Sequence, residues 1–477
     1  MPFILDNLPP FQPESSITCH ASARRDLSND AVGIAFLPTR QEPDAMAKFI
    51  LRRFLLLLLT MFLVSMAVFL IAESSPGNVA KNILGAFITP EQEASFLAQM
   101  GLDKPAWQRY LYWLAGSDWH ASKKVGLALE KITTPKGFEE WWAVDESGHL
   151  IRWTLQGENL MAMVREPDGG VTESVDNGRW TTDKNGKSTF WGVDRQNHAV
   201  LWEKGADREV WSFVVGKGWM KTTGGPVQYI PLKKGFLRGD PGVSLRTGRP
   251  VGKSMFVRLR NSLVLAGIAF VIVMPLALVL GIIAGLKEGS VKDRFLSISG
   301  MMFSVIPEFA TGIFLILIVS HWLQLVPGAT VFGEKAPWQR PDMLVLPVLT
   351  LTLIELGYVL RITRASMSEV MRSPYIRTAF LKGLPYWKVV TGHAVRNALI
   401  APITVIMLHV NWLLGGIVIV EVVFGYPGLG QYLLDSALYK DINALEAGTM
   451  IMVLLAVSTQ LVADIIYTFL NPRIRYA

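Results

Sequence analysis

The stretch EVMRSPYIRTAFLKGLPYWKVVTGHAVRNALIAP, residues 369–402, lies between two apolar segments near the C-terminal end of the chain. It is basic, largely helical in pattern and too polar for the interior of a bilayer. Gly383 and Pro385 divide it into two short helices that meet at a bend. The stretch therefore predicts a compact knob between two membrane spans, and such a knob needs a partner protein or a lipid surface to explain it.

The composition of the whole chain indicates an integral membrane protein. Of its 477 residues 51% are hydrophobic and 18% charged, and the mean hydropathy is +0.33, which disfavours a soluble globular protein. The net charge of +7 is typical of cytoplasmic loops and does not require a nucleic-acid partner. The single cysteine, Cys19, excludes an intramolecular disulfide and a zinc site built from cysteines.

Six windows have the length and apolarity that a bilayer core of about 30 Å requires. They are residues 54–72, 261–286, 295–325, 343–360, 399–424 and 447–470. The first is longer than the apolar core of a signal peptide and no small-residue cleavage site follows it, so we expect a retained anchor. Prolines lie in or at the ends of four windows and predict kinks: Pro275, Pro307, Pro347 and Pro402.

The basic residues of the short loops fall on one side of these six spans. They are Arg52, Arg53, Lys287, Lys292, Arg294, Arg361, Arg364, Arg372, Arg377, Lys382, Lys388, Arg396, Arg473 and Arg475. Because cytoplasmic loops carry the excess of Lys and Arg, both termini are expected in the cytoplasm. Residues 73–260, 326–342 and 425–446 then lie outside.

We expect four regions along the chain. Residues 1–45 lack periodicity and predict a poorly ordered extension, and Met46, which opens MAKFILRRF, is expected to be the true start. Residues 46–116 hold the first span and the start of the outer loop. Residues 117–235 form an insert of different composition, and residues 236–477 form a core of five spans with the cytoplasmic loop 361–398.

The insert contains a repeat, W-x-x-D-x-x-[GN]-x-x-x-x-W, in three copies that begin at Trp142, Trp180 and Trp191. An eleven-residue step with Asp and Gly or Asn at its centre predicts β-hairpins and a small antiparallel sheet. The tryptophans either form the core of this sheet or contact a ligand or partner: Trp142, Trp153, Trp180, Trp191 and Trp202. His149 and His198 occur in two copies only, so we expect no metal site.

The basic stretch resembles the cytoplasmic motif of the permease subunits of ABC importers of the oligopeptide, dipeptide and nickel class. Gly383 takes the place of the motif's glycine, and Ala379 and Val395 also fit the general consensus. The strings YIRTAFLKG and HAVRNALIAP are similar to the form found in the peptide branch. The resemblance extends to MAKFILRRF, GLDKPAWQRYLYWLAG, LRGDPGVSLRTGRPV, VVFGYPGLGQYLLDSAL and NPRIRY, and so covers most of the chain outside the insert.

The resemblance implies an all-α membrane bundle of six transmembrane helices, the type I permease fold, into which a small β-rich extracytoplasmic domain is inserted. It also implies that the knob docks in a groove on an ATP-hydrolysing subunit. The residues expected to couple to that subunit are Glu369, Arg377, Thr378, Ala379, Lys382 and Gly383. ATP and Mg would be bound by the partner subunits, and no cofactor is expected in this chain.

The chain has one near-match to a phosphate-binding loop, GRPVGKS at residues 248–254. It is one residue too short for the loop whose backbone amides wrap phosphates, and Thr247 stands where a glycine is required. No nucleophile or metal constellation has useful spacing elsewhere, so we expect no enzyme activity.

Polar residues inside membrane spans usually face the interior of the bundle. Glu355, His409 and Asn411 are therefore expected to line a translocation path, although packing or hydrogen bonding within the bundle is the alternative, and Asp464 lies nearer the cytoplasm. Glu355 precedes Arg361 by about one and a half turns and could pair within the helix bundle.

These features favour one half of a heterodimeric pore in a multi-pass importer of the bacterial inner membrane that moves peptides inward. The expected partners are a sister permease, two ATP-binding subunits and a periplasmic solute-binding protein. The periplasmic insert would either contact that binding protein or shield the mouth of the pore. An oligosaccharide or another polar solute is the alternative cargo. A membrane-anchored sensor is disfavoured, because one or two spans would suffice for it.

Overall fold

The computed structural model describes residues 43–74, 79–85, 87–134, 138–166, 169–206, 209–214, 218–223, 225–330 and 336–470. Nearly all of the expected N-terminal extension, residues 1–45, lies outside the described residues. By its contacts the chain divides into two units, Met1–Lys48 and Phe49–Ala477, and the features below belong to the second.

Apolar helices form a membrane bundle. They are α1 (Pro43–Ser74), α6 (Val251–Leu286), α7 (Val291–Val305), α8 (Glu308–Leu315), α9 (Val345–Met371), α13 (Ile400–Phe424), α14 (Leu429–Leu438) and α15 (Ile442–Leu470). Among the described residues, five helices are long and apolar enough to cross a membrane. If each of two bent helix pairs is counted as one further crossing, there are up to seven crossings. The helical membrane domain is thus confirmed, whereas the count of six is not.

The window 295–325 is not the single continuous helix that its apolarity predicted. Helix α7 ends at Val305, and the helix that starts at Glu308 is bent from it by 107°. The cause is Pro307, whose ring disfavours a helical conformation at the preceding residue; Ile306 accordingly has φ −70° and ψ 130°. The second helix continues as a π-helical segment, η3 (Ile316–Trp322).

The other three prolines do not break their helices. Pro275 lies inside α6, which continues past it. Pro347 and Pro402 each occupy the first turn of a helix, α9 and α13, where a backbone N–H has no partner within the helix. A proline at the start of a membrane helix therefore costs little.

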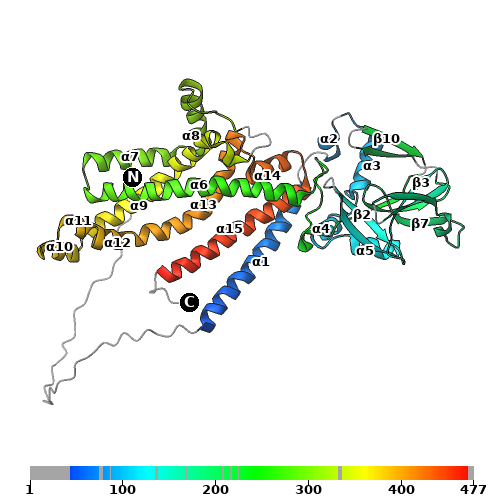
Figure 1. Cartoon of the computed structure of the whole chain (residues 1–477), viewed down its shortest axis with the longest axis horizontal. Coiled ribbons are helices and arrows are strands. Elements are labelled where there is room, and N and C mark those ends of the chain that lie inside the picture. The colour runs from blue at the N-terminus through cyan, green and yellow to red at the C-terminus, as the bar shows by residue number, and fades with distance from the viewer. Residues whose placement is uncertain are drawn as a thin grey trace, which may run out of the picture. The chain divides into compact units, whose positions relative to one another are not determined.

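Helix α9 packs closely against α6 and α7 through glycines (Figure 1). A Cβ atom at Gly281 of α6 would lie 2.8 Å from the carbonyl oxygen of Leu360, and one at Gly285 would lie 2.7 Å from that of Arg364. A Cβ atom at Gly357 of α9 would overlap the carbonyl oxygen of Gly300 of α7. Small residues of this kind allow helix backbones to approach within a membrane, so α9 lies in the interior of the bundle.

The insert is β-rich, as its repeat predicted. Its strands are β1 (Ala128–Thr133), β2 (Glu139–Val144), β3 (Leu150–Gln156), β4 (Asn159–Arg165), β5 (Val171–Val175), β6 (Thr181–Thr182), β7 (Ser188–Val193), β8 (His198–Glu203), β9 (Glu209–Val214), β10 (Gly218–Thr223) and β11 (Gln228–Pro231). All pairings are antiparallel, in the orders β1-β2-β3-β4-β5, β11-β8-β7-β6 and β10-β9.

Each copy of the repeat forms a hairpin with the same local hydrogen bonds. In the first copy, the Oδ1 atom of Asp145 accepts the backbone N–H groups of Ser147 at 2.9 Å and His149 at 2.8 Å. The Oδ1 atoms of Asp183 and Asp194 likewise accept the backbone N–H groups of the residues two and four positions further along the chain. The central Gly or Asn has a positive φ in every copy, which explains why the repeat requires those residue types.

Three of the five tryptophans of the repeat are buried. Trp153 and Trp202 belong to the core of the insert, whereas Trp142 lies under the guanidinium of Arg152, 4.4 Å from its ring centroid. The exposed fractions are 4% for Trp142, 0% for Trp153 and 3% for Trp202, so these rings offer no surface to a ligand and the contact alternative is wrong for them. Trp180 and Trp191 are partly buried and pack against the same core. The sheets bury large rings because a small domain has little other apolar surface to remove from water.

The two ends of the insert meet. Four short helices lead into it: α2 (Val79–Leu84), α3 (Pro90–Met100), α4 (Ala106–Ala115) and α5 (Asp118–Val125). The backbone N–H of Ser117 donates to the carbonyl of Lys233 at 3.0 Å, and the Ser117 hydroxyl donates to the carbonyl of Pro231. The chain thus leaves the permease core and returns to it at one place.

Candidate functional site

The basic stretch forms the knob that its sequence predicted. Helix α10 (Pro374–Leu381) and helix α11 (Tyr386–Val389) are joined through Gly383, which has a left-handed φ of +79°. Two further short segments, η6 (Val390–Ala394) and α12 (Val395–Ala398), lead to α13. A cluster of buried side chains holds the underside together: Met367, Ile376, Ala379, Val389, Val390, Ala394 and Ala398. The knob is therefore packed onto the end of α9.

The opposite face of the knob is apolar and exposed. Leu381 is 79% exposed and Trp387 is 70% exposed. The rings of Phe380 and Tyr386 stack with centroids 6.2 Å apart, and Tyr386 also contacts Trp387. Aromatic side chains gathered on an exposed surface mark a site for another protein.

Five of the six residues predicted to couple to an ATPase lie on the surface of the knob or beside it: Glu369, Arg377, Thr378, Lys382 and Gly383. Ala379 does not, because it is only 8% exposed and belongs to the buried underside. Coupling through Ala379 stays a prediction, and it would act through the packing of the knob rather than through direct contact. The small side chain of Ala379 allows α10 to lie close to the core.

Two of the predicted path residues form a pair. The Nδ1 atom of His409 on α13 lies 2.9 Å from the Oε2 atom of Glu355 on α9. Glu355 is 1% exposed, and among the described residues its Oε1 atom has no hydrogen-bond partner. The ring of Tyr358 lies 4.3 Å from that of His409. Glu355 thus pairs within the bundle, with His409. The side chains of Asn411 and Asp464 lie outside the described residues.

Two parts of the chain match known families. Residues 277–476 match the family described as binding-protein-dependent transport system inner membrane component, and residues 46–125 match the N-terminal region of such components. The chain belongs to this family. Its members are non-catalytic permease subunits. The near-match GRPVGKS runs from a turn at Gly248 into the start of α6.

Three curated relatives of this permease are transport proteins for peptides by name. The dipeptide transport system permease protein DppB of Escherichia coli (strain K12) is 30% identical over 313 residues, which are 60% of this chain and 87% of that protein. The oligopeptide transport system permease protein AppB of Bacillus subtilis (strain 168) is 33% identical over 52% of this chain and 80% of that protein. A probable peptide ABC transporter permease of Sinorhizobium fredii is 32% identical, with shares of 53% and 80%.

The basic residues of the permease's short loops are partly paired within the chain. Arg364 donates two hydrogen bonds to the buried Asp293, of 2.7 and 2.8 Å. Ser368 and Arg372 both donate to Glu288, in the turn between α6 and α7; the Ser368 hydroxyl and the Arg372 charge lower the pKa of Glu288. These contacts tie the base of the knob to the neighbouring turn.

Sequence reasoning missed a buried carboxylate in the permease core. Glu421 is 0% exposed, and it accepts hydrogen bonds from the Ser262 hydroxyl at 2.5 Å and from the backbone N–H groups of Gly430 and Gln431 at 2.7 and 3.2 Å. It therefore caps the start of α14 and joins it to α6. The signal was present, because Glu421 is an acid inside the apolar window 399–424.

Proposed function

We propose that this permease forms half of the translocation pore of an ATP-driven importer that carries peptides inward across the bacterial inner membrane. The family supports the pore role, and the names of the relatives support peptide cargo. The observation that carries the proposal is the knob, whose underside is packed onto α9 while its aromatic face is exposed.

The knob would dock on an ATP-binding subunit. Its buried underside makes it a rigid extension of α9, and packed contacts transmit displacement without being compressed. Closure of two ATP-binding subunits, one for this chain and one for a sister permease, would thus move the helices around the pore. ATP and Mg would be held by those subunits, and a periplasmic solute-binding protein would deliver the cargo.

Six crossings with both termini in the cytoplasm are the arrangement we favour. The apolar windows Tyr386–Met407 and Gly415–Leu438 both include parts of α13, so they would represent one crossing rather than two. The insert would then lie on the periplasmic side. Trp180 and Trp191, the partly exposed tryptophans of the repeat, remain candidates for contact with the binding protein.

The Glu355–His409 pair and Asn411 would line the path within the bundle. The pair lies between α9 and α13. Because ionisable residues inside a membrane bundle are costly to bury, those that occur there usually serve a function. Peptides carry both charges and hydrogen-bonding amides, which such groups recognise.

Purification of the tagged permease from native membranes in mild detergent tests the partners. We expect a P-loop ATPase and a second six-span protein in the preparation, and import of radiolabelled dipeptides but not oligosaccharides after reconstitution. The variant Trp387→Ala should lose the ATPase, whereas Trp107→Ala, which truncates a tryptophan of similar exposure (65%) on α4, should retain it. Recovery of the chain without any ATPase would contradict the proposal.

A further inference from the structure

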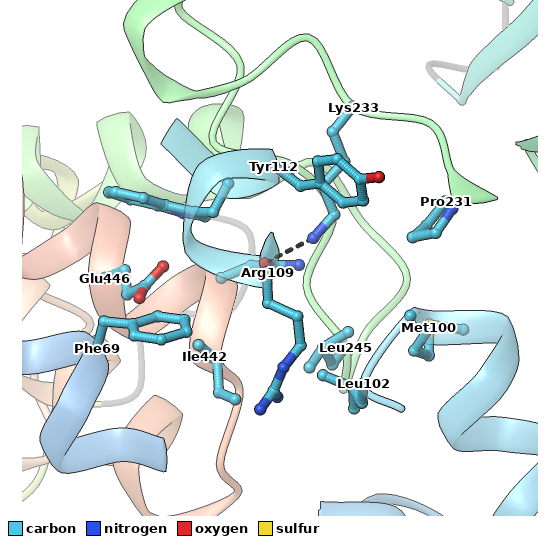
Figure 2. A pocket seen from close by; sticks show the side chains of 13 residues that line it. Phe69, Met100, Leu102, Arg109, Tyr112, Pro231, Lys233, Leu245, Ile442 and Glu446 are labelled. Carbon is cyan, nitrogen blue, oxygen red and sulfur yellow. Dashed lines mark hydrogen bonds between the residues drawn. The ribbon is translucent and has the colours of Figure 1, made fainter. Parts of the chain in front are cut away.

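A small cavity lies where α1, α4, the returning end of the insert and the start of α15 meet (Figure 2). Its polar side chains include those of Glu446, Lys233, Arg109 and Asn443, and apolar groups such as Phe69 complete the wall. In Figure 2 the carboxylate of Glu446 lies beside the ring of Phe69, and Lys233 enters from the loop that follows the strand ending at Pro231. No function proposed above uses this cavity.

Several buried polar atoms around the cavity lack partners among the described residues. Glu446 is 1% exposed, and neither of its carboxylate oxygens accepts a hydrogen bond. The Nε–H of Arg109 and the Nε1–H of Trp113 are buried donors without an acceptor. Leaving such groups unsatisfied costs about 1–3 kcal/mol for a neutral group and more for a charged one, so acceptors and donors surround a space that a polar ligand would fill.

Both acidic and basic side chains line the cavity. Arg109 is paired with Glu73, whereas Glu446 and Lys233, the other two acidic or basic groups at the cavity, form no ion pair among the described residues. Lys233 donates to Asn443 at 3.1 Å; burial lowers the pKa of Lys233, and the nearby charges of Glu446, Asp240 and Asp441 oppose that effect. A zwitterion would bring an opposite charge to each of the two groups, and its ammonium group would favour the ionised form of Glu446, which burial disfavours.

The size of the cavity limits its ligand. It measures about 40 Å³, whereas one water molecule needs roughly 10–15 Å³ on the same scale. There is room for roughly three water-sized groups. An ammonium group, one carbon and a carboxylate fill such a space, and a long side chain does not.

We propose that this cavity binds a small zwitterion, a free amino acid of the size of glycine or alanine. Its ammonium group donates to Glu446, and its carboxylate accepts hydrogen bonds from Lys233 and from the N–H groups of Arg109 and Trp113. Because α4, α15 and the end of the insert contribute these groups, the bound zwitterion joins three segments of the chain. The site is separate from the proposed peptide path and does not depend on it.

Equilibrium binding of radiolabelled glycine to the purified full-length chain, with the subunits that co-purify, tests the proposal. Unlabelled glycine and alanine should compete, whereas acetate and methylamine, which each carry one of the two charges, should not. The variant Glu446→Gln should bind glycine roughly ten- to a hundred-fold more weakly, the effect of losing a hydrogen bond to a charged group. Glu158→Gln, an exposed carboxylate between β3 and β4, is the matched control and should bind as the wild type does.

A change of specificity separates this site from a general structural defect. In Glu446→Gln the carboxylate that would repel an anion is absent while Lys233 is unchanged, so this variant should gain binding of acetate. Absence of glycine binding to the wild type means that the cavity holds water alone and overturns the proposal. Loss of glycine binding in Glu446→Gln without the gain of acetate binding also overturns it. Peptide import is measured separately in the same preparations, so failure of import bears on the proposed function alone.

Discussion

Glu355 and His409 lie 54 residues apart in the chain, yet a hydrogen bond of 2.9 Å joins the carboxylate on α9 to the imidazole on α13. The carboxylate is almost fully buried. A buried pair of this kind is costly to break, because the remaining partner keeps its desolvation penalty. The pair therefore acts on stability whether or not it also contacts cargo, and the two roles need separate tests.

We expect His409→Leu to lower the stability of the permease by about 3–5 kcal/mol, since Glu355 is left without its partner. The double variant Glu355→Leu/His409→Leu removes both polar groups and should recover most of that stability. Thermal unfolding in detergent measures both effects.

Peptide uptake then decides the role of the pair. If Glu355 and His409 line the path, the double variant folds and assembles but imports poorly. Wild-type import by the double variant would restrict the pair to packing between α9 and α13.

Gly383 provides a second prediction. Its φ of +79° disfavours any other residue except Asn or Asp, and no atom of the chain lies within 4 Å of a Cβ placed there. Gly383→Ala and Gly383→Leu should thus lose the same stability, about 1–2 kcal/mol from backbone strain. Only the leucine would meet a partner subunit, so uncoupling of ATP hydrolysis from import is expected in Gly383→Leu and not in Gly383→Ala.

Gly383→Asn is the conformational control, because Asn tolerates a left-handed backbone. It should retain both stability and coupling. Equal coupling in Gly383→Leu and Gly383→Asn would mean that the ATPase does not approach this face of the knob. ATPase activity and import are measured in the same reconstituted vesicles.

Local interactions explain what the sequence could predict. The hairpins follow from Asp145, Asp183 and Asp194, since each aspartate bonds to backbone groups two and four residues ahead and needs no distant partner. The bend of the knob follows from Gly383 for the same reason. In the window 295–325, Pro307 signalled a kink, but apolarity alone does not distinguish a kink from a 107° bend.

Features that depend on distant residues were not predictable. Ala379 is buried because it lies on the side of α10 that packs against the underside of the knob. The sequence pattern of an eight-residue helix is too short to predict which side that is. The cavity around Glu446 requires residues from four separate parts of the chain. Burial of Trp153 but partial exposure of Trp191 likewise depends on how the sheets pack.

The aromatic core of the insert should not tolerate a methyl group at Gly192. A Cβ there would lie 2.6 Å from Phe190, 2.9 Å from Trp153 and 3.0 Å from Trp202. Overpacking of this kind costs about 1–3 kcal/mol, so Gly192→Ala should lower the unfolding temperature of the insert. Gly178→Ala, where nothing lies within 4 Å, should not; near-ultraviolet circular dichroism of the tryptophans follows the transition.

Asp240 should make the junction between insert and core sensitive to acid. It accepts hydrogen bonds from Lys131 on β1 at 2.7 Å and from the backbone N–H groups of Gly242 and Lys234 at 3.0 and 3.3 Å. Burial raises the pKa of Asp240, but the hydrogen bond and charge of Lys131 and the two N–H groups outweigh burial, so its pKa lies below the ordinary value. Because the folded pKa is the lower one, the stabilisation is complete above the unfolded pKa of about 3.9. It is lost as the pH falls from there through the folded pKa.

Asp240→Asn should therefore destabilise the permease by about 1–3 kcal/mol at neutral pH, and its difference from the wild type should shrink as the pH falls below the ordinary carboxyl range. Unfolding temperatures of both proteins across that range measure the effect. Lys131 also pairs with Glu139 at 2.5 Å, which limits the loss because Lys131 keeps one partner. In the background Lys131→Met the same substitution should cost less, since the two residues are coupled. A difference that stays constant down to acidic pH would show that the carboxylate charge of Asp240 does not hold this junction, and that its contribution is one of shape and neutral hydrogen bonding.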